Sequence, residues 1–114
     1  MQMKRTITRT ICALAALLFH IHTARADGQY VGMVKPLHYG ASVYLDISAS
    51  QATGRPGCAT RPYVRLQEAP TNQAYKEKFA MILAAWLAGR PVELLGNGTC
   101  TDEGDEIIYM VSIP

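Results

Sequence analysis

Residues 71–91 have the pattern of one long amphipathic helix, which limits the possible folds because the remaining segments read as short strands and turns. The largest apolar side chains of this segment fall on one narrow arc of a helical wheel, formed by Tyr75, Phe79, Ile82 and Trp86. Thr71 or Asn72 can cap the start, while Gly89 and Pro91 are typical of the end. We therefore expect a single helix whose aromatic face is packed into the core.

The N-terminal region has the three parts of a secretory signal peptide. Basic residues at Lys4, Arg5 and Arg9 precede an apolar run over residues 11–21, and Ala24-Arg25-Ala26 provides a small-residue cleavage site. About eleven apolar residues are too few for the roughly twenty that a membrane-spanning helix needs. We expect cleavage after Ala26, export to the periplasm or beyond the cell, and no membrane span in the mature chain.

Removal of residues 1–26 changes the size and the charge of the protein. The mature chain has 88 residues, enough for one core, so we expect residues 27–114 to form a single domain. Four of the eleven basic residues precede position 27, so seven basic and nine acidic residues remain, a formal net charge of −2. This mildly acidic chain lacks the clustered basic residues of nucleic-acid-binding proteins, so we expect no nucleic-acid partner.

Only two cysteines remain after cleavage, Cys58 and Cys100. In an exported protein such a pair indicates a disulfide. A bridge that closes a loop of about forty residues would contribute on the order of 4 kcal/mol in the chain-entropy description. A redox or metal pair is the other interpretation, but neither cysteine has a second Cys or His nearby in the sequence.

The strand candidates lie on both sides of the helix. Alternating or apolar runs predict strands over residues 30–39, 42–48, 59–67, 92–95 and 107–113. The resulting order is three strands, one helix and two strands, with no linker that would divide a domain. This order is that of the OB fold, a five-stranded, partly open barrel. We therefore expect a mainly β protein with one helix plugging an OB-type barrel; another small α+β sandwich is the alternative.

One candidate ligand surface is the outer face of the second and third strands. If these strands pair, four side chains meet there, namely Tyr44, Arg61, Tyr63 and Arg65. Aromatic rings can stack on sugars and Arg can bind a carboxylate, which suits an acidic glycan. Outward Tyr and Arg side chains are, however, more often ordinary amphipathic cover or a subunit contact.

The back of the helix is a second candidate surface, with only small or apolar residues at Ala80, Met81, Ala84 and Ala88. Such a face permits close approach of another helix, so one interpretation is self-association. The other is that alanine is a good helix former and tolerates exposure.

The remaining polar residues do not form a recognisable catalytic or metal-binding set. Four carboxylates lie within residues 102–106, but their spacing is not that of an EF-hand, and a solvated loop is the better interpretation. His38 is the only histidine after position 26 and has no partner nucleophile near it in sequence. We expect a non-enzymatic protein without a cofactor or a bound metal.

A resemblance to a known group rests on residues spread over most of the mature chain, which are Cys58, Tyr63, Tyr75-Lys76, Phe79-Ala80, Leu83-Ala84-Ala85, Gly89-Arg90, Val92 and Cys100. This set resembles small exported bacterial OB-fold proteins such as the B subunits of pertussis-like and subtilase-type AB5 toxins. The resemblance implies a ring-forming homo-oligomer, with five subunits expected, that binds cell-surface glycans and accompanies a separate catalytic chain. The alternative function is a small structural or inhibitory envelope protein that binds another protein.

Overall fold

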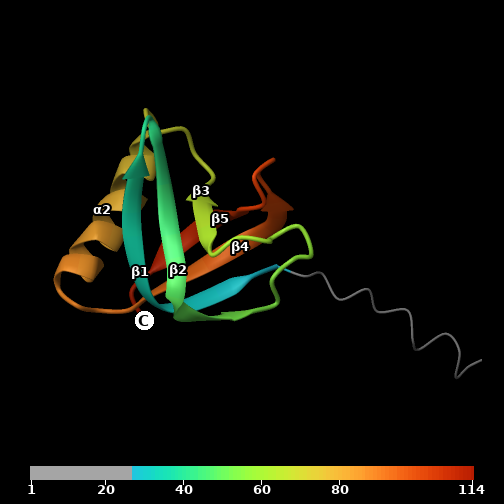
Figure 1. Ribbon diagram of the computed structural model, residues 1–114. Coiled ribbons are helices and arrows are strands. Elements are labelled where there is room, and N and C mark those ends of the chain that lie inside the picture. The colour runs from blue at the N-terminus through green and yellow to red at the C-terminus, as the bar shows by residue number, and fades with distance from the viewer. Residues whose placement is uncertain (1–26) are drawn as a thin grey trace, which may run out of the picture.

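The computed structural model describes residues 27–114, so the predicted signal peptide and its cleavage site lie outside the described part. The described chain is mainly β with one helix (Figure 1). Its elements in chain order are β1 (Gln29–Tyr39), β2 (Ser42–Thr53), β3 (Tyr63–Leu66), α2 (Gln73–Leu87), β4 (Val92–Cys100) and β5 (Glu106–Ser112). The predicted order of three strands, a helix and two strands is confirmed.

The five strands form one sheet that closes in a ring, in the order β1-β2-β3-β5-β4. The start of β1 is shared, because Gln29–Gly32 pairs with both β2 and β4, whereas its second half pairs with β2 alone. The pair of β3 and β5 is parallel and the other pairs are antiparallel. Figure 1 shows β1 and β2 as a long hairpin, with α2 along one side of it.

The two ends of α2 follow the residues that the sequence marks for them. At the start, the Asn72 side chain accepts a hydrogen bond from the Ala74 amide at 2.8 Å. At the end, Gly89 has a φ of 66°, and the Gly89 and Arg90 amides donate to the Trp86 and Ala85 carbonyls. This arrangement is a Schellman motif, in which glycine supplies the left-handed residue.

The core contains a smaller part of the predicted helix face than expected. Ile82 is fully buried, but Tyr75, Phe79 and Trp86 are only half-buried, and the second buried residue of the helix is Ala85. The reason is that α2 packs against β1 and β5, so only one strip of its surface reaches the interior. The strands supply the rest of the core, mainly through Tyr30, Val34, Leu45, Ile47, Val64, Val92, Leu94 and Ile108.

Strand lengths differ from the predicted ones in two places that matter for the site. The third strand is short, because residues 59–62 lie outside the sheet and only Leu45 and Asp46 of β2 pair with β3. The fourth strand continues through Gly96 and Gly98, where the sequence predicts a turn, because the register with β5 shifts on both sides of Gly96. These bulges make room for a buried carboxylate described below.

Candidate functional site

The pairing of β2 and β3 brings the predicted ligand residues together on the outside of the ring. Asp46 lies opposite Tyr63 in this pair, so the preceding outward residue, Tyr44, reaches the same surface. The ring centres of Tyr44 and Tyr63 are 5.6 Å apart and the rings are tilted by 59°. Arg61 and Arg65 reach the same rings, so all four predicted residues lie in one cluster.

Both arginines stack on these tyrosines. The Arg61 guanidinium carbon lies 5.4 Å from the centre of the Tyr44 ring and 5.2 Å from that of Tyr63. The Arg65 guanidinium carbon lies 4.5 Å from the centre of the Tyr44 ring. Cation–π contacts of this kind fix the position of both partners. Tyr44 thus contacts two cations and is less free to receive a ligand than the sequence suggests.

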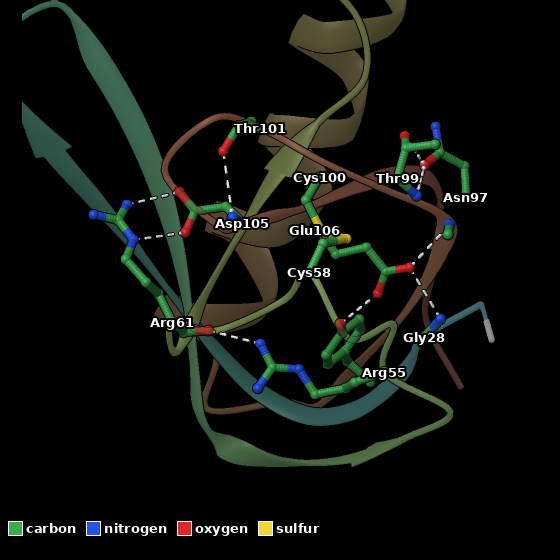
Figure 2. Close-up of a disulfide and its surroundings, with 12 residues drawn as sticks. Gly28, Arg55, Cys58, Arg61, Asn97, Thr99, Cys100, Thr101, Asp105 and Glu106 are labelled. Carbon is green, nitrogen blue, oxygen red and sulfur yellow. Dashed lines mark hydrogen bonds and ion pairs between the residues drawn. A yellow bond between two sulfur atoms is a disulfide. The ribbon is translucent and has the colours of Figure 1, made fainter.

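The Arg61 side chain is also bound by the loop between β4 and β5. Its Nε and Nη2 atoms donate to the two carboxylate oxygens of Asp105 at 2.8 and 2.7 Å (Figure 2). Nη2 also donates to Glu103 at 2.8 Å. The hydrogen bonds to Asp105 raise the pKa of Arg61 above its ordinary value, although desolvation acts in the opposite direction. Arg61 is therefore committed to carboxylates of its own chain.

A shallow hollow of about 240 Å³ opens beside this cluster, lined by Leu37, Tyr39, Tyr44, Arg61 and Tyr63. Tyr39 ends β1 and is 77% exposed, the most exposed large apolar side chain of the described residues. The Tyr44 hydroxyl donates to Glu103 at 3.2 Å, so this carboxylate lies at the edge of the hollow. The hollow thus combines aromatic walls with one committed arginine, and Glu103 contacts it through the Tyr44 hydroxyl.

The acidic segment over residues 102–106, predicted to be a solvated loop, is in part buried, and its last residue, Glu106, begins β5. Asp105 and Glu106 have no exposed surface, whereas Glu103 is half-exposed. Sequence reasoning missed these residues because no local pattern separates a buried carboxylate from a solvated one. The residues that surround the buried Glu106 are glycines, namely Gly28, Gly96 and Gly98, but they are far from it in sequence or gain this role only in the tertiary fold.

Glu106 lies at the centre of a buried hydrogen-bond network (Figure 2). Its carboxylate accepts hydrogen bonds from the Tyr30 hydroxyl and from the Gly28 and Gly98 amides, both at 3.0 Å. Burial, reinforced by the hydrogen bond to Glu106, raises the pKa of Tyr30 to about 12. A Cβ on Gly96 would lie 2.1 Å from a Glu106 oxygen, so the absence of a side chain at Gly96 leaves the space that the Glu106 carboxylate occupies.

The predicted disulfide between Cys58 and Cys100 is confirmed, with Cα atoms 6.0 Å apart. It joins the loop after β2 to the end of β4. Backbone hydrogen bonds strengthen the same junction, because the Thr60 and Arg61 amides both donate to the Gly104 carbonyl. The bridge therefore holds Arg61 next to the acidic loop that binds it.

The predicted self-association face of α2 is exposed in the described chain. Ala80, Met81, Ala84 and Ala88 all lie on the surface. A second hollow, of about 430 Å³, runs along this face to the chain end and is lined by Met81, Ala84, Ala85, Ala88, Arg90 and Ile113. Leu87, on the same helix, is 76% exposed. The residues along this hollow are apolar except for Arg90.

Among residues 27–114, no group of three or more His, Cys, Asp or Glu side chains is arranged to hold a metal ion. No helix in the same range has the length and apolar character needed to cross a membrane. Comparison of the chain with family models, with curated proteins and with solved structures gave no match.

Proposed function

We propose that this chain is an exported, non-enzymatic binding module with an OB-type barrel, and that its ligand is a glycan. The ring order β1-β2-β3-β5-β4, with a helix between β3 and β4, supports the OB assignment. Export rests on the N-terminal sequence pattern alone.

The observation that carries the proposal is the position of the hollow beside Tyr44 and Tyr63. OB folds bind oligosaccharides and oligonucleotides over the face of strands two and three, between the loops that follow strands one and four. The hollow has a similar position, because Tyr39 ends β1, Tyr44 and Tyr63 lie on β2 and β3, and Glu103 of the loop after β4 accepts a hydrogen bond from Tyr44.

Charge favours a glycan over an oligonucleotide. The mature chain is mildly acidic, and Arg61 is bound by Asp105 and Glu103. A phosphate backbone requires free cationic side chains, whereas a sugar needs an apolar wall and a few polar groups.

A glycan array probed with the purified protein tests this function. We expect binding to a defined group of glycans and its loss in Tyr63→Ala, with circular dichroism as the check that the variant folds. Tyr109→Ala is the matched control, because Tyr109 is a half-exposed tyrosine on β5 that does not line the hollow. Absence of binding to every glycan, or equal binding by both variants, would show that the proposal is wrong.

A second candidate role, self-association, is favoured by the apolar hollow on α2. Small residues at Ala84 and Ala88 let another chain approach closely, while Met81 and Leu87 supply apolar area. Light scattering should give a mass of several chains for the wild type and a single-chain mass for Ala84→Glu. A single-chain mass for the wild type would contradict self-association, and the ring of five subunits implied by the resemblance would fail with it.

A further inference from the structure

The charges around the hollow are already balanced within the chain. Arg61 donates to Asp105 through two nitrogen atoms and to Glu103 through one of them. The Arg65 guanidinium lies 3.9 Å from the same Asp105 carboxylate and its side chain is only 25% exposed. Two cations therefore face two carboxylates, and a ligand carboxylate would have to displace one of the existing pairs.

The free parts of the hollow are aromatic and apolar. The Tyr44 ring is in contact with the guanidinium groups of Arg61 and Arg65, so less of it is open to a ligand. Tyr39 is 77% exposed and Leu37 is 37% exposed, which leaves an aromatic ring and an aliphatic side chain open to a ligand. An open ring of this kind matches the apolar face of a pyranose.

One polar acceptor remains at the edge. Glu103 is 49% exposed, and its Oε2 atom accepts hydrogen bonds from Arg61 and Tyr44. These two donors fix the carboxylate in place, so Oε1 is available to accept from ligand hydroxyl groups. A fixed carboxylate attracts hydroxyl donors and repels an anionic ligand.

We infer that the hollow binds a neutral sugar ring, stacked on Tyr39 and hydrogen-bonded to Glu103, and that it does not select a sialylated terminus. This inference rests on the proposed function and narrows its ligand class. It replaces the acidic glycan expected from the sequence, because the arginines that would recognise a carboxylate are already paired. The volume of about 240 Å³ is below the roughly 300–1,000 Å³ of pockets for drug-sized molecules, so a single ring is the unit recognised.

The test compares a matched pair of probes, lactose and sialyllactose, together with an array that carries other neutral and sialylated pairs. Isothermal titration should show tighter binding of the neutral member. Tyr39→Ala should weaken that binding by roughly three- to tenfold, the contribution of one aromatic stacking contact. Because Tyr39 is exposed, this variant should fold normally, and Tyr109→Ala is again the control.

The possible outcomes separate the inference from the proposed function. Binding of neutral glycans that is weakened by Tyr39→Ala supports both the inference and the proposed function. Binding restricted to sialylated members, or neutral binding unaffected by Tyr39→Ala, overturns the neutral-sugar inference while glycan binding stands. Absence of binding to every glycan overturns the proposed function and the inference together.

Discussion

Asp105 and Glu106 are adjacent in the chain and equally buried, but they point in opposite directions and meet different partners (Figure 2). Asp105 binds the Arg61 guanidinium, which is one-third exposed at the rim of the hollow. Within residues 27–114, Glu106 accepts from neutral donors alone, which are the Tyr30 hydroxyl and two backbone amides. Burial alone therefore does not define the role of an acidic residue. Asp105 positions a surface residue, whereas Glu106 holds strands together.

The largest expected effect is the difference between removing these two carboxylates. Glu106→Ala leaves the Tyr30 hydroxyl and two amides without their acceptor, and should lower the free energy of unfolding by about 3–5 kcal/mol. Asp105→Ala should cost about 1–2 kcal/mol, because water and Glu103 can still solvate Arg61. Urea unfolding of both variants measures the two values. Equal losses would show that the two acids have the same structural role.

The next effect tests the space around Glu106 without changing the acid itself. In Gly96→Ala the new Cβ would lie 2.1 Å from a Glu106 oxygen, so either the carboxylate or β4 has to move. We expect a loss of about 2–3 kcal/mol, as in other overpacked interiors. Gly57→Ala is the control, because no heavy atom lies within 4 Å of its added Cβ. Melting temperatures near wild type for both variants would mean that Gly96 does not have this role.

Several parts of the structure follow from local sequence patterns. The helix with Thr71 or Asn72 as its cap, the order of the elements along the chain and the disulfide could be predicted, because each depends on local periodicity or on simple counting. The meeting of Tyr44 and Tyr63 could also be predicted, since it follows from two neighbouring strands pairing.

Other parts of the site could not be predicted, because they depend on residues far apart in the sequence. The contact between Tyr30 and Glu106 spans 76 positions, and that between Arg61 and Asp105 spans 44. Arg61 alone suggests a free cation for a ligand, and only its acidic partners change that interpretation. The aromatic face of α2 was overestimated for a similar reason, because the tilt of a helix on its sheet is a tertiary property.

Alkaline pH should destabilise the protein by ionising Tyr30, whose hydroxyl donates to Glu106. Burial and the bond to Glu106 raise the pKa of this tyrosine from 10.0 to about 12. The unfolded chain therefore releases the proton first, so stability is complete below pH 10 and falls as the pH rises towards 12. The loss should reach about 2–3 kcal/mol.

Urea unfolding at several pH values between 9 and 12 measures this slope. Tyr30→Phe is less stable at neutral pH but should show a weaker decline, because the titrating group is gone. Tyr39→Phe, which removes an exposed hydroxyl, should keep the wild-type decline. An identical slope in wild type and Tyr30→Phe would assign the alkaline loss to another group.

The smallest stability effect should come from Glu103, a half-exposed acid of the same segment. Its contact with Arg61 is half-exposed, and pairs of that kind contribute little, so Glu103→Gln should change the free energy of unfolding by less than about 0.5 kcal/mol. The same substitution should still weaken glycan binding, because an amide carries one acceptor oxygen where the carboxylate has two. An unchanged free energy of unfolding together with weaker glycan binding in isothermal titration would place Glu103 at the ligand. A loss of stability as large as that of Asp105→Ala would instead group Glu103 with the structural acids and remove it from the site.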